Sequence, residues 1–395
     1  MVVKEHGFRS TGTDTLGKKR DQIDCVESES ASDAADLMTM SSLGKRGRFG
    51  NQVFQYMFLK LCAQVNGAEV EVPQWDGKIL FDLNDPTISK QLPPAVEVWE
   101  SGRNMFDVIP EMIPMIERKT GFSCRRVGWN AILEPVPSCD LWGHFQIHTR
   151  HLRRYRSFIQ ETFTPAADLT EALTPVFQKL SGQEGPLIGV HVRRGDYAKK
   201  PRLGCAHTMP IKWWVNHITK LKERNRDAVI FICSDDLEEV LPAFQELNPV
   251  TVHDLDIKLP DRMEKMDYIV DFEILKQCQI LTISNSTYSF LPSILGNKGK
   301  EFFRPVCNSS EPFVRFDPWN SEPLLFYDES PRRIVKFPLQ SAQWEFTTEG
   351  TSGIPGWLWN YAAACLKLKL FRIYLGLKNG GPRGAIKSLL TGLKC

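Results

Sequence analysis

Several features that would narrow the function quickly are absent from this chain of 395 residues. Residues 1–20 are mixed polar and basic, without the apolar stretch of a signal peptide. No window supplies the roughly 18 uninterrupted apolar residues that a membrane-spanning helix needs. The ten cysteines include no Cys-x-x-Cys pair, so we expect neither a zinc ribbon nor another structural metal site.

Two common phosphate-binding motifs are also missing. The chain has no Gly-x-x-x-x-Gly-Lys-Ser/Thr loop and no Gly-x-Gly-x-x-Gly fingerprint, which argues against a P-loop NTPase and against a dinucleotide-dependent dehydrogenase. The formal net charge is only +2, with 24% charged residues, so we expect no nucleic-acid partner. Any anion must therefore be bound by a local cluster of cationic side chains.

Composition divides the chain into four segments. Residues 1–42 are rich in Ser, Asp, Glu and Lys, which predicts a disordered leader. The remaining segments are an N-terminal α/β domain (43–184), a Rossmann-like domain (185–330) and a C-terminal extension (331–395). The boundary between the two domains is placed at 182–186.

The N-terminal domain begins with a helix. From Gly50, apolar residues recur on one stripe, and Asn66-Gly67 supplies the C-terminal stop. A strand is predicted from 68 to 73, a second strand ends near Trp142, and a basic helix is predicted from His148 to Phe163.

The second domain alternates strands with helices. Strands are predicted at 187–192, 228–233, 250–252 and 280–283, and helices at 211–224, 237–247, 267–278 and 288–295. This alternation is typical of βαβ units and predicts a parallel sheet. Ligands of such sheets bind at the carboxyl ends of the strands.

Three of the predicted strands end in unusual polar sequences: His191-Val-Arg-Arg-Gly-Asp-Tyr, Ser234-Asp-Asp and Ser284-Asn-Ser-Thr-Tyr-Ser. Arg193 and Arg194 are costly to bury unless an anion meets them, and their planar guanidinium groups suit a diphosphate. The alternative is that they pair with Asp196 or Asp235. The hydroxyl-rich start of the helix near Thr287 favours an anion site, so the pattern favours nucleotide diphosphate binding.

A divalent metal is not expected. Asp254-Leu-Asp256 has the spacing of a metal-binding pair, but a solvated loop explains it better. Asp235 and Asp236 are adjacent at a predicted helix start, where acidic residues complement the helix dipole. We expect arginines, and no cofactor, to neutralise the leaving diphosphate.

Four motifs together resemble the α-1,2-fucosyltransferase family, glycosyltransferase family 11. They are Gly47-Arg-Phe-Gly-Asn-Gln-Val-Phe-Gln-Tyr, Gly189-Val-His-Val-Arg-Arg-Gly-Asp-Tyr, Asp271-Phe-Glu-Ile-Leu-Lys-Gln-Cys and Ser284-Asn-Ser-Thr-Tyr-Ser-Phe. The segment from Trp142 to Gln146 is similar to the family's Gly-Tyr-Phe-Gln, with His144 in place of the usual Tyr. The aromatic pair usual after the last motif is replaced by Phe290-Leu291-Pro292, so acceptor choice is open.

The resemblance implies an α/β, GT-B-like fold with two Rossmann-like domains and the nucleotide-sugar site in the C-terminal one. It implies that L-fucose is transferred with inversion from GDP-fucose to a galactoside hydroxyl in α-1,2 linkage. Arg194 matches the arginine on the donor diphosphate, and Asp196 is our hypothesis for the base. The candidate substrate-binding residues are Gly50, Asn51, His191, Arg193, Ser234, Asp235, Asp271, Ser286, Thr287 and Ser289.

Alternatives remain at this stage. Protein O-fucosyltransferases and α-1,6-fucosyltransferases share an arginine motif and the Gly-Arg-Phe-Gly-Asn-Gln opening, and a catalytically silent carbohydrate- or nucleotide-binding protein is a further alternative. Residues 356–395 combine Trp, Tyr and Leu with seven Lys and Arg and no acidic residue, which indicates either peripheral membrane contact or a helix packed on the catalytic body. Family members occur in the Golgi membrane or the cytoplasm, so the compartment stays open.

Overall fold

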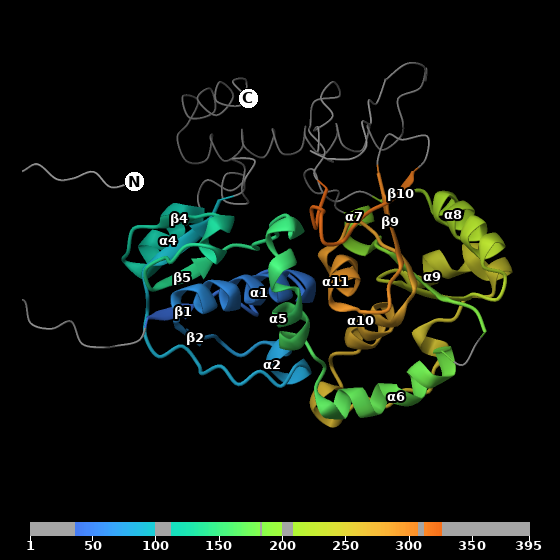
Figure 1. Cartoon of the computed structure of the whole chain (residues 1–395), viewed down its shortest axis with the longest axis horizontal. Coiled ribbons are helices and arrows are strands. Elements are labelled where there is room, and N and C mark those ends of the chain that lie inside the picture. The colour runs from blue at the N-terminus through green and yellow to red at the C-terminus, as the bar shows by residue number, and fades with distance from the viewer. Residues whose placement is uncertain (1–35, 99–111, 182–183, 200–207, 307–311, 326–395) are drawn as a thin grey trace, which may run out of the picture. The chain divides into compact units, whose positions relative to one another are not determined.

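The computed structural model describes residues 36–98, 112–181, 184–199, 208–306 and 312–325. Within them the chain forms two five-stranded sheets, each accompanied by helices (Figure 1). The C-terminal extension, with its predicted membrane contact at 356–395, lies outside the described residues, and so does nearly all of the predicted leader.

The first sheet has the order β2-β1-β5-β3-β4, and all of its strand pairs are parallel. Its strands are β1 (Leu37–Thr39), β2 (Glu69–Glu71), β3 (Pro94–Glu97), β4 (Arg125–Val127) and β5 (Cys139–Trp142). The α-helices of this part are α1 (Phe49–Asn66), α2 (Asp76–Leu80), α4 (Met112–Thr120) and α5 (Arg156–Thr162), and the 3₁₀ turns are η1 (Trp129–Ile132), η2 (Thr149–His151) and η3 (Arg153–Tyr155).

The second sheet has the order β10-β9-β8-β6-β7 and is parallel except for the β9–β10 pair. Its strands are β6 (Leu187–Val192), β7 (Val229–Ser234), β8 (Ile280–Thr282), β9 (Glu301–Pro305) and β10 (Phe313–Arg315). The α-helices are α6 (Ala167–Ser181), α7 (Gly195–Lys199), α8 (Ile211–Arg224), α9 (Leu237–Val240), α10 (Tyr268–Gln277) and α11 (Thr287–Leu295). The 3₁₀ turns are η4 (Leu241–Leu247), η5 (Val252–Asp254) and η6 (Asp261–Met263).

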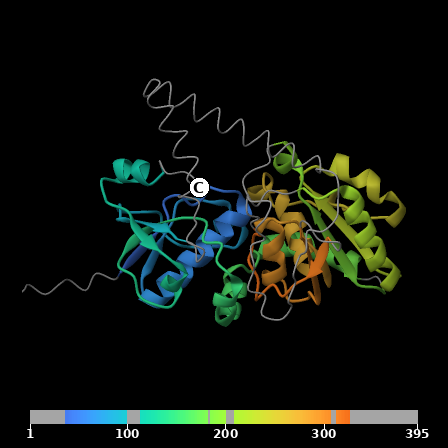
Figure 2. The same cartoon turned by 90° about the horizontal axis from the view of Figure 1, so that it is seen from above.

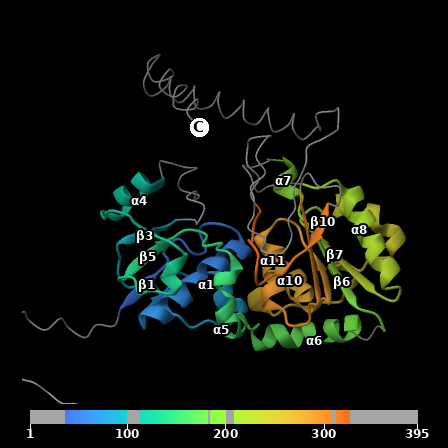
Figure 3. The ribbon, with the colours of Figure 1, turned by 45° about the horizontal axis from the view of Figure 1, so that its top comes forward.

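These two sheets, each mainly parallel and accompanied by helices, confirm the predicted α/β fold class with two Rossmann-like sheets. Residues on β6 alternate between the two layers of helices that cover the second sheet. Ile188 and Val190 join the core beneath α8, whereas Gly189 faces α10. A Cβ at Gly189 would lie 2.6 Å from Cys278 Sγ, so glycine lets α10 approach the strand closely. Figure 3 shows β6 and β7 between α8 and α10.

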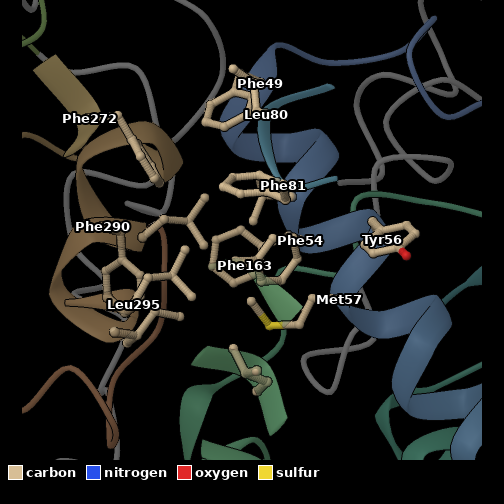
Figure 4. Close-up of a cluster of buried hydrophobic side chains, with 14 of the residues drawn as sticks. Phe49, Phe54, Tyr56, Met57, Leu80, Phe81, Phe163, Phe272, Phe290 and Leu295 are labelled. Atoms are coloured by element: carbon tan, nitrogen blue, oxygen red, sulfur yellow. The ribbon is translucent and has the colours of Figure 1, made fainter. Parts of the chain in front are cut away.

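Helix α1 follows from its sequence in a direct way. Its apolar residues Val53, Met57 and Leu61 are buried on one stripe, and Gly67 ends the helix in the left-handed conformation, with φ 61°. The start of α1 packs against the second sheet's helices through aromatic rings. Phe49 meets Phe272 at 5.2 Å between ring centroids, and Figure 4 shows this cluster. The large core cluster includes buried residues of both sheets' helices, so α1, α10 and α11 are held together by apolar burial.

Several sequence-based predictions need correction. The leader was predicted to run to residue 42, but β1 is a strand of the first sheet and ordered structure begins by Asp36. Residues 250–252 form only an isolated bridge from Val250 to Phe231, because the chain turns into η5. The predicted helix from His148 to Phe163 is η2, η3 and α5 in succession.

The predicted helix at 237–247 is also divided, because α9 continues as the 3₁₀ turn η4. Helix α6, just before the predicted boundary at 182–186, packs against α10 of the second sheet. Figure 2 shows the same elements from above. Among the described residues, no helix combines the length and apolar character needed to cross a membrane.

Candidate functional site

The three polar sequences predicted to share one site do meet, at the carboxyl ends of β6, β7 and β8. Strand β6 lies between the other two, and Val192 pairs with Ser234. The Arg193 N–H donates to Ser284 Oγ at 2.7 Å, and that hydroxyl donates to the His191 carbonyl at 2.7 Å. The Arg194 N–H donates to Asp235 Oδ1 at 2.8 Å. Side chains from neighbouring strands thus fix the backbone that carries both arginines.

Both arginines form ion pairs in this structure. Arg193 pairs with Asp196 and, at 2.8 Å, with Asp235. Arg194 pairs with Glu239 of α9. The side chains of Arg193 and Arg194 are only 13% and 17% exposed. The buried Arg194 Nε has no hydrogen-bond partner within the ranges that the structure describes. The alternative of pairing with Asp196 or Asp235 therefore holds for Arg193, while Arg194 keeps an unused donor.

Helix α1 brings the first sheet's residues to the same place. A Cβ on Gly50 would lie 2.6 Å from Tyr288 N and 2.8 Å from Thr287 C, so the glycine permits contact between the starts of α1 and α11. Asn51 Oδ1 accepts a hydrogen bond from Thr287 Oγ1 at 2.8 Å. Two helix N-termini, whose dipoles favour negative charge, are therefore close together beside the arginine motif.

Beneath the strand ends lies a group of shielded polar side chains. His191 is 4% exposed, and its ring lies 5.3 Å from that of Tyr288. Its Nδ1 has no hydrogen-bond partner among the described residues. Burial, assisted by Arg193, lowers the pKa of His191 to about 3, so this imidazole is neutral. Asp271 Oδ1 is buried and likewise has no hydrogen-bond partner in the described part of the chain. Burial, with a smaller contribution from Asp267, raises the pKa of Asp271 to about 7.

The hydroxyl residues predicted to bind substrate have structural contacts here. Ser234 Oγ donates to the Val192 carbonyl at 2.6 Å and accepts from the Asp236 N–H at 3.0 Å. Ser286 is the N-cap residue of α11 and makes no side-chain cap. Ser289 is fully buried, and its hydroxyl lies 3.4 Å from two carbonyls of its own turn. Of this group, Ser286 keeps its hydroxyl available and Ser289 does not.

The two acidic pairs weighed as metal ligands have other roles. Asp254 accepts from the N–H and hydroxyl of Thr251 at 2.8 Å, forming a capping box on η5. These hydrogen bonds lower the pKa of Asp254. Asp236 is the N-cap of α9, and Asp235 pairs with Arg193. Among the residues that the structure describes, no group of three His, Cys, Asp or Glu side chains is arranged to hold a metal.

Sequence analysis overlooked three residues of this region: Arg48, Ser284 and Glu239. Arg48 Nη2 lies 3.3 Å from Asp196 Oδ2, so a residue preceding α1 reaches the arginine motif. Arg48 stands inside the Gly-Arg-Phe-Gly motif and Ser284 inside Ser-Asn-Ser-Thr, so the motifs themselves contained both signals. Glu239 lies in an ordinary acidic first turn, and only the fold shows that it meets Arg194.

The chain is thus an α/β protein with two mainly parallel sheets. Its candidate anion site consists of two arginines and two helix N-termini at the carboxyl edge of the second sheet. Residues 142–315 match the family model described as glycosyl transferase family 11. That stretch contains both arginines and the Ser-Asn-Ser-Thr motif, and it confirms the family resemblance over this part of the chain.

Individual proteins are similar over different lengths. A galactoside α-(1,2)-fucosyltransferase 1 of Bos taurus is 26% identical over 179 residues, which cover 44% of this chain and 42% of the bovine protein. The match thus spans less than half of that relative. Solved structures of NodZ α-1,6-fucosyltransferase with GDP (TM-score 0.45, 14% identity) and of POFUT1 with GDP-fucose (TM-score 0.43, 12% identity) are also similar. They cover 72% and 69% of this chain, and 99% and 98% of their own.

Proposed function

We propose that the protein is an inverting glycosyltransferase that moves L-fucose from GDP-fucose to a galactoside hydroxyl in α-1,2 linkage. The observation that supports this most is the meeting of Arg193 and Arg194 with the start of α11 at one strand edge, inside the segment that matches glycosyl transferase family 11. The α-1,2 linkage and the galactoside acceptor are taken from the bovine relative's name.

The diphosphate of the donor would replace the carboxylates that now hold the arginines. Asp196, Asp235 and Glu239 occupy the guanidinium groups in this structure, and phosphate oxygens make the same bidentate contacts. The unused Arg194 Nε supplies a donor that no described residue engages. In this mechanism no divalent metal is required, because arginines and helix N-termini neutralise the charge that develops on GDP.

The nucleoside would be recognised below the arginines. His191 Nδ1 and Asp271 Oδ1 are two shielded polar atoms without partners, and such atoms are costly unless a ligand completes them. The guanine base has both N–H donors and ring acceptors, so it can satisfy a carboxylate and an imidazole at once.

The transfer step is an in-line displacement. The acceptor hydroxyl oxygen forms a bond to C1 of fucose, the bond from C1 to the phosphate oxygen breaks, and its electron pair stays on GDP. The hydroxyl proton passes to a base, for which we propose Asp196. Its carboxylate is now paired with Arg193 and Arg48, so donor binding would free it for this role as the diphosphate takes over the arginines.

The test is a transfer assay with purified protein, GDP-fucose and lactose in the presence of EDTA. We expect free GDP and a fucosylated product whose linkage is α-1,2 by NMR, and we expect Asp196→Asn to lose transfer while still binding GDP. A protein that binds GDP but neither hydrolyses nor transfers fucose over a panel of acceptors would instead be a binding protein. Product in another linkage, or on a polypeptide only, would overturn the α-1,2 assignment.

A further inference from the structure

The carboxyl edge of the first sheet carries a second group of functional side chains. Trp142 ends β5, and His144 follows it. Arg46, from the loop after β1, stacks on Trp142 with its guanidinium carbon 5.4 Å from the ring centroid. Because ligands of parallel sheets gather at carboxyl ends, this edge is the first sheet's counterpart of the arginine site.

The turn at His144 is held from both sides. Glu97, the last residue of β3, accepts the His144 N–H at 2.7 Å through Oε2. A Cβ on Gly143 would lie 2.6 Å from that same oxygen, so glycine is required beside the carboxylate. On the other side, Gln55 of α1 donates to the Gly143 carbonyl at 2.7 Å. The backbone at residue 144 is therefore fixed, while the imidazole makes no hydrogen bond to any residue that the structure describes.

Backbone strain adjoins His144. Phe145 has φ 51°, in the left-handed region that a bulky side chain rarely adopts. Its ring is buried and stacks on Phe58 with 4.2 Å between centroids. Strain of this kind persists only where the surrounding structure holds it in place, and it clusters at functional sites. Phe145 is buried in the core, whereas the His144 side chain is half-buried.

The turn is also connected to the proposed donor site. Gln146 donates to Asn51 Oδ1 at 2.8 Å, and the same oxygen accepts from Thr287 at the start of α11. Two hydrogen bonds thus join the segment that carries His144 to the helix beside the arginines. A group bound at His144 would be next to a nucleotide sugar at that helix.

We propose that His144, with Arg46 beside it, binds a hydroxyl pair of the acceptor galactoside and is the residue that sets acceptor specificity. This inference rests on the proposed function. A neutral imidazole has one donor and one acceptor, which is the complement of a sugar hydroxyl, and a guanidinium offers two parallel donors to adjacent hydroxyls. Burial, together with Arg46, lowers the pKa of His144 to about 4, so the imidazole stays neutral at physiological pH.

The experiment compares His144→Phe, His144→Gln and the control His253→Phe, whose histidine lies on the exposed turn η5. We expect His144→Phe to raise the KM for lactose about tenfold, the loss expected for one or two hydrogen bonds. His144→Gln should restore part of this, because an amide also donates and accepts. KM for GDP-fucose, hydrolysis of GDP-fucose without acceptor, and melting temperature should stay at wild-type values in all three.

The outcomes separate this inference from the proposed function. A wild-type protein that does not bind GDP-fucose by calorimetry overturns the proposed function. An unchanged lactose KM in His144→Phe, or equal changes in the KM of both substrates, overturns only the role of His144. If saturation-transfer NMR shows no transfer from the wild-type protein to lactose in the presence of GDP, the claim that the acceptor is a galactoside is overturned.

Discussion

The carboxyl edges of the two sheets use their carboxylates differently. At the first sheet, Asp140 accepts hydrogen bonds from the Thr39 hydroxyl, from the N–H and hydroxyl of Ser41 and from Trp142 Nε1, at 2.6–2.9 Å. At the second sheet, Asp196 and Asp235 pair mainly with arginines. The donors to Asp140 are neutral groups. Asp196 and Asp235 instead hold cations, which we propose that a diphosphate can take over. We therefore distinguish Asp140, a structural carboxylate, from Asp196 and Asp235, which we propose are exchangeable.

The largest effect is expected on transfer kinetics, from a change at the carboxyl edge of the second sheet. Arg194→Ala should lower kcat/KM for transfer by about 10²–10³-fold, because about 3–4 kcal/mol of transition-state stabilisation is typical of one preorganised donor. Arg194→Lys should recover only part, since lysine lacks the planar fork. The measurement is initial-rate kinetics with GDP-fucose and lactose. If Arg194→Ala kept the wild-type kcat/KM, the carboxyl edge of the second sheet would have no special role in transfer, and the two edges would not differ in function.

At the structural edge, Asp140→Ala should destabilise the fold without a specific effect on GDP affinity. Its removal leaves buried donors of Thr39, Ser41 and Trp142 unsatisfied, so we expect a loss of about 2–4 kcal/mol in the free energy of unfolding. Urea unfolding measures this, with the exposed Asp261→Ala as the matched control. A loss below about 1 kcal/mol would show that Asp140 is as replaceable as the carboxylates of the other edge.

Asp271 should make the free energy of unfolding depend on pH. Its pKa is raised to about 7 by burial and by Asp267, so the folded protein binds this proton more tightly than the unfolded chain. The stabilisation from the proton is full below the ordinary pKa and is lost as pH rises through about 7. Asp271→Asn should therefore gain on the order of 2 kcal/mol relative to wild type between pH 5 and pH 8.

Unfolding curves of both proteins at the two pH values provide the measurement. Asp267 helps to raise the pKa of Asp271, and Asp271 in turn helps to raise the pKa values of Cys233 and Tyr288. A difference between the variant and wild type that does not change with pH would contradict the raised pKa.

The smallest effect is expected at an ion pair outside both edges. Arg262 contacts Asp82 at 3.0 Å and Asp168 at 2.6 Å, but its side chain is 42% exposed. Solvent screens such pairs, so Arg262→Ala should cost less than about 1 kcal/mol of stability and leave transfer kinetics unchanged. It is thus the control for Arg194→Ala. A comparable loss of activity in both variants would mean that net charge, rather than position, is responsible.

Sequence alone predicted the elements whose patterns are local. Strand β6 and helix α8 were predicted with their observed bounds, and α1 ends at the expected glycine. Strand β1 was missed because its three residues are defined by pairing with β2 and β5, which no local pattern reveals. Strands β9 and β10 were missed for the same reason, since they pair with each other and with β8.

In the candidate site, too, the features with a local sequence pattern could be predicted, and those that depend on long-range packing could not. The polar sequences after β6, β7 and β8 could be placed together because parallel strands end at one edge. The ion pair from Arg48 to Asp196 and the hydrogen bond from Thr287 to Asn51 join residues far apart in sequence. They depend on how α1 meets α11, which is fixed by packing of Phe49 and Gly50 rather than by any motif.

The central claim is that the arginines at the second sheet's edge exchange carboxylates for a nucleotide diphosphate. A crystal structure of the protein with GDP tests this most directly. We predict diphosphate oxygens within hydrogen-bond distance of the Arg193 and Arg194 guanidinium groups, with the ion pair between Arg193 and Asp196 broken. A diphosphate bound away from both arginines, with their ion pairs intact, would contradict the account.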